Sequence, residues 1–476
     1  MILAILPEAL LLVLAGTVVG FDAIWKPEKR HRLGWLTFGG LVFIAILAML
    51  VSRPGQEARL IFGGMLHQDW YSFAFTLLFL FGASITTLLV MGMSELGDKG
   101  EFYTLLLISV IGMCLMASAG DIVMLYLAIE TTSIPLYILA GFMTKDVKST
   151  EAGFKYMLFG AAASAVMLYG FSLLYGFAGT TNIYQIALSF YDAQLPKLVV
   201  LGSLLLILVG FGFKVSVVPF HFWAPDVYEG APTPVAGFLS TASKAAGFAV
   251  LLRFLVVVFS PIATVEWTTI LALISVFTMT LGNILALAQK NIKRLLAYSS
   301  IAHAGYILIG LIAYSYLGKA SVVFYLIGYL ITNLAAFGAV VTFWQVEKTD
   351  DISAYAGLSR RAPGLALVML VAFLSLAGMP PLVGFIAKVF VFAAAVQAGY
   401  VWLAVIGVLN SIVGLYYYLT VLKVVYLYRS DKDDVLVPIS TPYRIALTVL
   451  TIGILLLGTL FAPWYSWSTI IAGSIF

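Results

Sequence analysis

Four lysines and one glutamate lie within long apolar stretches of the chain, where ionisable side chains are uncommon. The sequence reads FGFKVSVVP around Lys214, FLSTASKAAGF around Lys244, GMPPLVGFIAKVF around Lys388, EAGFKYMLF around Lys155 and YLAIETTSIP around Glu130. An ammonium group in the centre of a membrane costs about 2.5 to 3.5 kcal/mol, so such a side chain normally faces protein, water or a carboxylate. Amines and carboxyls can take up and release protons. The residue types therefore predict the transfer of protons or ions through a membrane.

Prolines interrupt two of these stretches. Pro219 follows Lys214 by five residues, and Pro380 and Pro381 precede Lys388. Proline removes a backbone donor and clashes with the preceding turn, so it frees carbonyl groups that need protein or water partners inside a membrane. A broken helix beside a buried charge favours an ion path. The alternative is that Lys214 extends to the aqueous interface and Pro219 only ends the helix.

Glu130 is the one acidic residue that we place near the middle of a span, about 15 Å from the helix start. One interpretation pairs it with a buried lysine, Lys214 first of all. Pairing keeps both groups charged and couples their titrations. The other interpretation leaves Glu130 protonated and hydrogen-bonded between helices, which burial permits. We favour the pair with Lys214.

The remaining candidates differ in expected depth. Lys244 lies about ten residues into its stretch, beside a hydroxyl-rich turn at 240–243 that could hold water or pass protons. Lys155 lies in the first turns of its stretch, so an ammonium group at the interface is a real competitor. His303 lies well inside an apolar stretch, and an unperturbed imidazole titrates near physiological pH. A buried packing histidine is the alternative for His303.

These residues belong to a chain that is 62% hydrophobic and only 10% charged, with a mean hydropathy of +1.06. Soluble domains are about 45 to 50% apolar. The composition predicts an all-α polytopic membrane protein, and apolar runs of about 20 residues predict fourteen transmembrane helices. We expect these helices near 2–20, 33–51, 71–94, 102–119, 121–142, 153–177, 198–220, 234–258, 267–288, 296–314, 320–346, 364–397, 400–428 and 442–470.

The loops between these helices alternate in charge. Sixteen Lys and Arg residues fall on one side of the membrane, and only Arg53, Arg59, Lys197 and Lys319 fall on the other. Loops rich in Lys and Arg stay in the cytoplasm, so both termini are expected on the outer side. The same bases account for the net charge of +4 and the pI of about 8.8, so no nucleic-acid partner is needed to explain them.

Residues that bind redox cofactors are scarce. Cys114 is the only cysteine, which excludes an intrachain disulfide and a cysteine-ligated iron–sulfur cluster. There are four histidines, and only His303 lies well inside a span, so a bis-histidine haem is not expected. No Gly-rich phosphate loop follows a strand. The sequence therefore predicts no redox cofactor, nucleotide or metal bound by this chain.

The two proline breaks fall in the seventh and twelfth expected helices, five helices apart. An odd repeat length brings the second copy in from the opposite face, which predicts two inverted five-helix repeats, helices 4–8 and 9–13, each with a broken helix. We divide the chain into an N-terminal three-helix segment (1–100), a first repeat (101–258), a second repeat (259–428) and a C-terminal segment (429–476). The N-terminal segment shows no ionisable residue deep in the membrane, and we assign it a packing role.

Several words of this sequence are similar to those of a known family: FKVSVVPFHFWAPDVYEGAPTP, STASKAAGF, GNILALAQKNIKRLLAYSSIAHAGY and SLAGMPPLVGFIAKVF. They resemble the antiporter-like membrane subunits of the proton-pumping NADH–quinone oxidoreductase, respiratory complex I, and subunit N in particular. The likeness covers most of residues 100 to 428. The word YEGAPTP favours subunit N over its paralogues.

The resemblance implies a fourteen-helix membrane-arm subunit that carries protons and binds no redox cofactor. By the family's pattern, Glu130 pairs with Lys214 in a first half-channel. Lys155 and Lys244 lie along a central hydrophilic axis, and Lys388 serves a second half-channel. An incoming signal would separate Glu130 from Lys214, and the released proton would pass along the axis.

The resemblance also implies partners and a location. His303 and ordered water would relay protons between the lysines. NADH, flavin, iron–sulfur clusters and quinone are expected in the neighbouring subunits of complex I, and the whole assembly in the bacterial plasma (inner) membrane. The alternative function is a membrane subunit of a multisubunit cation/proton antiporter, driven by an ion gradient. A purely structural scaffold would leave the buried lysines unexplained.

Overall fold

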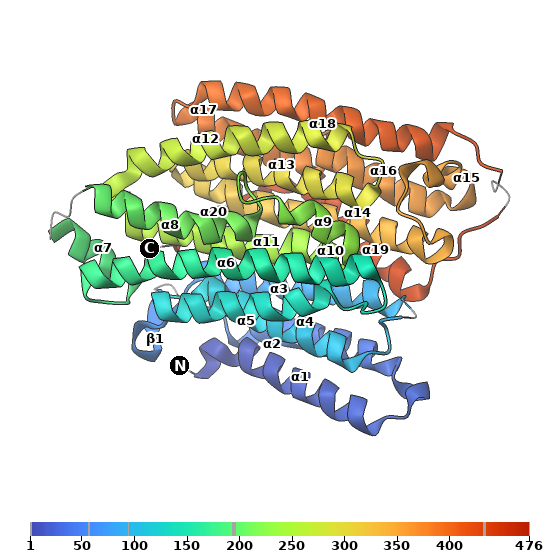
Figure 1. Ribbon diagram of the computed structural model, residues 1–476, viewed down its shortest axis with the longest axis horizontal. Helices are drawn as coiled ribbons and strands as arrows, with labels where there is room; N and C mark the ends of the chain where they lie inside the picture. The colour runs from blue at the N-terminus through green and yellow to red at the C-terminus, as the bar shows by residue number, and fades with distance from the viewer. Residues whose placement is uncertain (1, 56–57, 94, 193–196, 432–434, 476) are drawn as a thin grey trace.

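The computed structural model describes residues 2–55, 58–93, 95–192, 197–431 and 435–475. Within these residues, thirteen helices are long and apolar enough to cross a membrane, and two shorter apolar helices, Pro363–Ala377 and Val383–Gln397, stand on either side of a break. Counted as one broken span, that pair completes fourteen. The chain is an all-α polytopic membrane protein, and its helices run side by side along one direction (Figure 1).

The helices of the first half are α1 (Leu6–Ile24), α2 (Arg32–Val51), α3 (Trp70–Met91), α4 (Gly100–Ser118), α5 (Ile122–Ala140), α6 (Val147–Ala178), α7 (Ile183–Asp192), α8 (Lys197–Val215), α9 (Trp223–Gly230), α10 (Thr233–Phe238) and α11 (Lys244–Phe254). Those of the second half are α12 (Ser260–Leu287), α13 (Ile292–Ile312), α14 (Tyr316–Glu347), α15 (Leu358–Arg361), α16 (Pro363–Ala377), α17 (Val383–Gln397), α18 (Val401–Leu427), α19 (Thr441–Thr459) and α20 (Phe461–Gly473).

Short elements complete the fold. Two strands, β1 (Arg59–Ile61) and β2 (Leu66–Gln68), pair antiparallel between α2 and α3. Single 3₁₀ turns are η1 (Ile2–Ile5), η2 (Pro27–Lys29), η3 (Phe62–Gly64) and η6 (Ile352–Tyr355). Two π turns, η4 (Leu239–Ser243) and η5 (Leu255–Phe259), flank α11. The start of α1 and the end of α20 lie at the same end of the bundle, as an even number of spans requires (Figure 1).

A central layer of helices positions the candidate residues. α3, α13, α14 and the segment from α10 to η5 are buried almost throughout, whereas α1, α2 and α12 bury fewer than half of their residues. α13 packs closely on α12 at two glycines: a Cβ at Gly282 would lie 2.7 Å from the Ala302 nitrogen, and one at Gly305 would lie 2.6 Å from Met279 Cγ. The backbones of α12 and α13 therefore lie close together, which fixes the position of α13 in the interior of the protein.

Both helices that the sequence predicts to be broken are interrupted. α8 ends at Val215 and α9 begins at Trp223, with Pro219 between them. α16 ends at Ala377, and α17 begins at Val383, after Pro380 and Pro381. The Val218–Pro219 and Pro380–Pro381 peptide bonds are cis. The inverted relation of the two repeats, and the domain limits drawn from it, stay predictions.

Three elements differ from the expected spans. The last expected span, 442–470, is two helices, α19 and α20, that meet at Leu460. Pro463 explains this, because proline cannot donate to the carbonyl four residues earlier. The eighth span contains the π turns η4 and η5, which a hydrophobic pattern does not reveal. The amphipathic helix α7 was not predicted, because it is too short to span a membrane.

Candidate functional site

Lys214 and Glu130 line one small cavity without touching each other. Lys214 is buried in the last turn of α8, and its Nζ donates to Ser133 Oγ of α5 at 3.1 Å. Glu130 of α5 accepts a hydrogen bond from Ser164 of α6. All four side chains line a cavity of about 20 Å³. Across the described residues, no ion pair joins Glu130 to Lys214.

Glu130 and Lys214, which we expected to pair, line the same cavity but form no direct ion pair among the described residues, and their functional pairing stays a prediction. Ser133 follows Glu130 by three residues, so both side chains lie on the same face of α5. The serine hydroxyl, and not the carboxylate, takes the hydrogen bond from the ammonium group. The cavity between them is large enough for a single water, which needs about 10 to 15 Å³.

The break between α8 and α9 satisfies its backbone groups with protein atoms. Trp223 of α9 donates its indole N–H to the carbonyl of Phe213 at 3.1 Å, across the break. The Val218 N–H donates to Thr278 Oγ1 of α12 at 3.1 Å. The Trp223 ring stacks on Tyr156 of α6, with ring centroids 4.4 Å apart. These contacts fix the turn that presents Lys214.

Lys244 is fully buried at the start of α11, directly after the π turn η4. Its Nζ donates to the Ser300 carbonyl of α13 at 2.8 Å and also contacts Ser300 Oγ. The nearby hydroxyls of Ser240 and Thr241 donate to the carbonyl of Gly237 instead. Ser240 and Thr241 thus donate within their own helical segment, Ser240 also accepts from Asn333 of α14, and the partner of Lys244 comes from α13.

His303 is bonded at both ring nitrogens. Its Nδ1 is 2.7 Å from the Tyr325 hydroxyl, and its Nε2 is 3.4 Å from the Tyr418 hydroxyl. Tyr418 also bonds Ser299, the residue before Ser300 on α13. A row of polar groups therefore lies between Lys244 and His303: Ser300, which holds Lys244, its chain neighbour Ser299, and Tyr418. The two serines lie in a hydroxyl-rich stretch of the sequence, which is a usable signal for a polar site. No sequence pattern marks Tyr418 as part of that site.

Lys388 is buried on α17, against the end of α16. Its Nζ donates to the carbonyls of Leu376 and Ala377 at 3.1 and 3.0 Å, and lies 4.9 Å from the ring centre of Tyr306. These carbonyls end a helix, where intrahelical partners are missing. Gly378 has φ of +88°, a conformation that favours glycine and that turns the chain away here. The carbonyls freed by the break thus meet the lysine directly.

The structure brings three of the predicted residues together around α13. His303 and Tyr306 lie on one face of α13, and the Tyr306 ring touches Lys388, so His303 stands between Lys244 and Lys388. A separate cavity of about 280 Å³ reaches Lys388 from the side of α18. Lys214 lies apart from these three: Gly247 of α11 packs against its stem, where a Cβ would be 3.0 Å from Lys214 Cγ.

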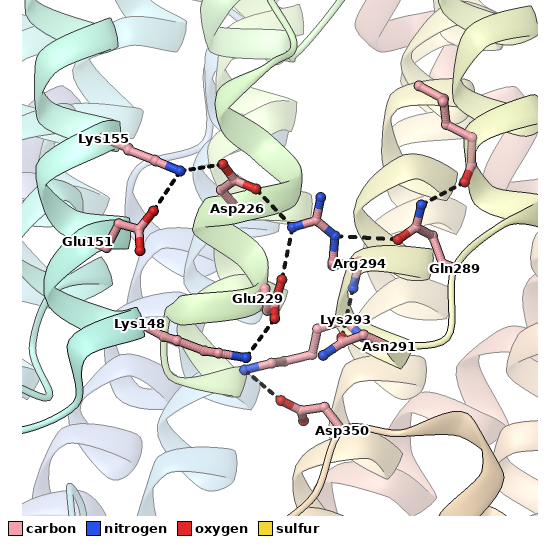
Figure 2. Close-up of polar contacts among 11 residues, drawn as sticks. Lys148, Glu151, Lys155, Asp226, Glu229, Gln289, Asn291, Lys293, Arg294 and Asp350 are labelled. Atoms are coloured by element: carbon pink, nitrogen blue, oxygen red, sulfur yellow. Dashed lines mark hydrogen bonds and ion pairs between the residues drawn. The ribbon is translucent and has the colours of Figure 1, made fainter.

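Lys155 does not lie on this buried axis. Its side chain is 33% exposed, and its Nζ pairs with Glu151 at 2.7 Å and with Asp226 of α9 at 2.6 Å. Figure 2 shows it at the edge of a group of charged residues. The structure places Lys155 beside these carboxylates, about two turns from the start of α6 at Val147. Its expected role in proton transfer stays a prediction, as does the alternative of an interfacial lysine.

This group, the α9 ion-pair cluster, ties α9 to α6 and α13 (Figure 2). Burial alone would raise the pKa of Asp226, but hydrogen bonds from Lys155 and Arg294 outweigh it and leave that pKa below its usual value. The pKa of Glu229 is lowered in the same way by Lys148 and Arg294. The cluster consists of Lys148, Glu151, Lys155, Asp226, Glu229, Lys293, Arg294 and Asp350.

A second buried ion pair was not predicted from the sequence. Arg253, near the end of α11, contacts Asp69, the N-cap residue of α3, and both side chains are at most 3% exposed. His67 lies 3.0 Å from Asp69, and the Tyr184 hydroxyl lies 2.9 Å from His67. The N-terminal segment therefore carries a buried charge, contrary to the purely packing role expected of it. Asp69 and Arg253 are 184 residues apart, so the sequence pattern could not join them.

Buried lysines beside two broken helices define an antiporter-like membrane subunit. Residues 119–414 match the family described as "NADH:quinone oxidoreductase/Mrp antiporter, TM". The chain belongs to this family and, by its curated relatives, to the subunit N branch of it. One such relative is NADH-quinone oxidoreductase subunit N of Trichlorobacter lovleyi, which is 41% identical over 459 residues, 95% of this chain and 93% of the relative. The resemblance drawn from the sequence is confirmed.

Solved structures agree with the fold. A chain of respiratory complex I from Thermus thermophilus is 36% identical, with a TM-score of 0.82 and coverage of 97% of this chain and 98% of that one. A chain of the Mrp complex from Dietzia sp. has a TM-score of 0.84 at 21% identity, and the match covers 99% of this chain and 97% of that one. The second likeness concerns the fold alone.

Proposed function

We propose that this chain is the proton-translocating membrane-arm subunit of an NADH–quinone oxidoreductase, driven by quinone reduction in neighbouring subunits. One observation carries the proposal: polar side chains of α13 lie between the buried lysines. Ser300 accepts from Lys244, its neighbour Ser299 bonds Tyr418, Tyr418 bonds His303, and the Tyr306 ring lies against Lys388. Hydroxyl and imidazole groups each donate and accept, so they can pass a proton along such a row. The family and the relatives named subunit N support the assignment.

The first step belongs to Glu130 and Lys214. Their shared cavity has room for one water, which would bridge the carboxylate and the ammonium group and hold the proton on Lys214. A signal from the partner subunits moves the two apart. Loss of a partner about 5 to 6 Å away removes roughly 3 kcal/mol of attraction at an effective dielectric constant of 20. Lys214 then gives up its proton toward Lys244, across the face of α11 that carries Gly247.

The later steps follow α13. Lys244 gives a proton to Ser300. A water or a rotation of the hydroxyl carries a proton on to Ser299, because no hydrogen bond within the described residues joins the two serines directly. Ser299 and Tyr418 then each donate their own proton as they accept one, so that His303 receives a proton. His303 passes the proton to Lys388, whose ammonium form is held by the carbonyls at the end of α16. Lys388 releases it toward the outer side.

The proposal assigns the redox chemistry to other chains. NADH, flavin, iron–sulfur clusters and quinone bind in the partner subunits, and this chain contributes to the enzyme as a translocating subunit. Its solved relatives are chains of multi-subunit assemblies, which supports membrane-arm partners. We place the assembly in the bacterial plasma (inner) membrane, with both termini on the outer side.

The second candidate is a subunit of a multisubunit cation/proton antiporter. The fold shared with a chain of the Mrp complex favours it, but the identity to that chain is 21%, against 36% for the chain of complex I. The two functions differ in their partners. Purification of the intact assembly decides: flavin and iron–sulfur subunits bound to this chain support the oxidoreductase, and membrane subunits alone support the antiporter.

Proton transfer itself is tested by reconstituting the assembly in vesicles and measuring proton uptake during quinone reduction. Lys214→Met should abolish the pumping that depends on this chain, because no other ammonium group lines that cavity. Lys290→Gln, an exposed lysine outside the site, is the control and should pump normally. Normal pumping by an assembled Lys214→Met complex would refute the proposed function.

A further inference from the structure

The short helix α9 is held in place by ion pairs as well as by buried packing. It has eight residues, and two of them, Asp226 and Glu229, are carboxylates that each meet two cations. Lys155 and Lys148 approach from α6, and both carboxylates share Arg294 of α13 (Figure 2). The cluster holds four cations and four anions, so its charges balance without an outside ligand.

Arg294 is the central residue of this cluster. Its Nη1 lies 2.8 Å from Asp226 Oδ1 and 2.8 Å from Glu229 Oε2, and its Nε donates to Gln289 Oε1 at 3.4 Å. The preceding residue, Lys293, donates to the Ala231 carbonyl, which ends α9, at 3.3 Å. The first turn of α13 therefore fixes both the side chains and the C-terminal end of α9.

The position of α9 affects the position of Lys214 through Trp223. Trp223 begins α9, and its indole N–H holds the carbonyl of Phe213, the residue directly before Lys214. Trp223 also stacks on Tyr156 of α6 with an interplanar angle of 15°. A shift of α9 must therefore move the Phe213 carbonyl or break this hydrogen bond, and either change alters the end of α8 that presents Lys214.

The same arginine belongs to the helix that holds Lys244. Ser300 follows Arg294 by six residues on α13, about 9 Å along the axis, and receives the Lys244 ammonium group. The lowered pKa values of Asp226 and Glu229 keep both carboxylates charged at neutral pH, so they serve as fixed anchors and do not carry protons.

We propose that Arg294 is a positioning residue that couples Lys214 to Lys244, because its ion pairs set α9 against α13. With Arg294 in place, the break that presents Lys214 and the serine that holds Lys244 keep one relative position. The inference deepens the proposed function, on which it rests, and adds a residue that contacts neither lysine. It also explains Lys148 and Lys155, because these two lysines secure the α6 side of the same carboxylates.

Arg294→Gln in the intact, reconstituted complex is the first test. Loss of the guanidinium leaves Asp226 and Glu229 with one lysine each, and the two carboxylates then repel each other. Coupling residues outside the ligand sites typically change coupling by roughly 2- to 30-fold, and we expect a loss of this size in protons pumped per electron. Quinone reduction and assembly should persist. Lys290→Gln should leave the ratio unchanged, and an unchanged ratio in Arg294→Gln would overturn the inference.

A double substitution separates positioning from general loosening. Trp223→Phe keeps an aromatic ring against Tyr156 but removes the hydrogen bond to Phe213. If Arg294 acts through α9 and Trp223, the double variant should pump about as well as Arg294→Gln alone, since coupled changes are not additive. Fully additive losses would mean that Arg294 acts elsewhere. Should Arg294→Gln fail to assemble, Asp226→Asn removes one arm of the cluster and must show the same non-additivity with Trp223→Phe.

The result for Lys214→Met distinguishes this inference from the proposed function. If Lys214→Met pumps normally, the proposed function fails whatever Arg294 does. If Lys214→Met abolishes pumping while Arg294→Gln pumps normally, proton transfer stands and only the positioning role of Arg294 is lost.

Discussion

Serines are the partners of three charged groups within this protein. Ser133 accepts a hydrogen bond from Lys214, Ser300 accepts one from Lys244, and Ser164 donates one to Glu130. A hydroxyl both donates and accepts, so it can satisfy an ammonium group and still pass a proton onward. Among the described residues, each of these charged groups thus bonds a serine hydroxyl and not another charged group.

Glu130→Gln should lower proton pumping coupled to quinone reduction, because the amide cannot stabilise the ammonium group across the shared cavity. The proton-to-electron ratio of the reconstituted complex measures the effect, with subunit content as the check on assembly. Full pumping in a normally assembled variant would remove Glu130 from the transfer path.

Lys244→Ala should impair pumping more than Lys155→Ala. Lys244 is buried and held by α13, whereas Lys155 is one third exposed and shares Asp226 with Arg294. Lys244→Arg should also slow transfer, because a guanidinium keeps its proton in proteins. Pumping rates of the three variants in one vesicle preparation test the order. Equal and small losses for both alanine variants would end the role of Lys244.

For single residues, the sequence predicted burial but not the contacts. The depth of Lys214, Lys244 and Lys388 within apolar stretches predicted their burial, and all three are at most 6% exposed. Their partners could not be predicted, because Ser300 is 56 residues from Lys244 and Ser133 is 81 residues from Lys214. The contacts of Lys155 were not predicted either, since the apolar pattern does not mark where the carboxylate of Asp226 on α9 would lie.

At the level of elements, two broken helices present their lysines differently. The α8–α9 break satisfies its carbonyl through Trp223, and Lys214 reaches over to α5. The α16–α17 break leaves its carbonyls to Lys388 itself. The second lysine is therefore part of the break, whereas the first lies beside it.

Lys388→Arg should slow pumping while the complex still assembles. A guanidinium can keep hydrogen bonds to the carbonyls of Leu376 and Ala377 but does not release its proton under these conditions. Proton uptake by the vesicles gives the rate, and the amount of purified complex reports assembly. Unchanged pumping would leave Lys388 with a structural role and confine transfer to the first half of the chain.

Prolines and span length predicted where the helices lie and where two of them break, but not the local irregularities within them. Pro219, Pro380 and Pro381 marked both breaks, because a missing donor is visible in the sequence. The π turn before Lys244 was not visible, since it needs no special residue and is stabilised by tertiary packing. Pro463 was a usable signal for the α19–α20 boundary that the expected span ignored.

For the whole molecule, the Asp69–Arg253 pair joins the N-terminal segment to the rest of the protein. The pair is almost completely buried, and removal of one partner from such a pair costs about 3 to 5 kcal/mol. Asp69→Asn should therefore lower the temperature at which the purified complex loses this subunit. Asp69→Asn combined with Arg253→Met should recover part of the loss, and no change in either variant would mean that the pair contributes nothing.

The Asp69–Arg253 pair stabilises the protein only within a defined pH range. Burial raises the pKa of Asp69, but Arg253 and His67 outweigh it and lower that pKa below the usual value. A lowered pKa in the folded state means that the stabilisation is complete above the ordinary aspartate range and disappears only as the pH falls through the folded value. Thermal scans of the wild type should thus show no loss from this pair between neutral and mildly acidic pH.

On the proposed proton route, the cavity of about 20 Å³ between Glu130 and Lys214 is too small for a hydrated cation. A sodium ion travels with a shell of several waters, and stripping that shell requires several oxygen ligands in its place. Oxygens of Glu130, Ser133 and Ser164 line the cavity, but it has room for only one water, whereas a proton needs only a hydrogen bond at each end. Replacing sodium with potassium or choline in the medium should therefore leave the pumping rate unchanged.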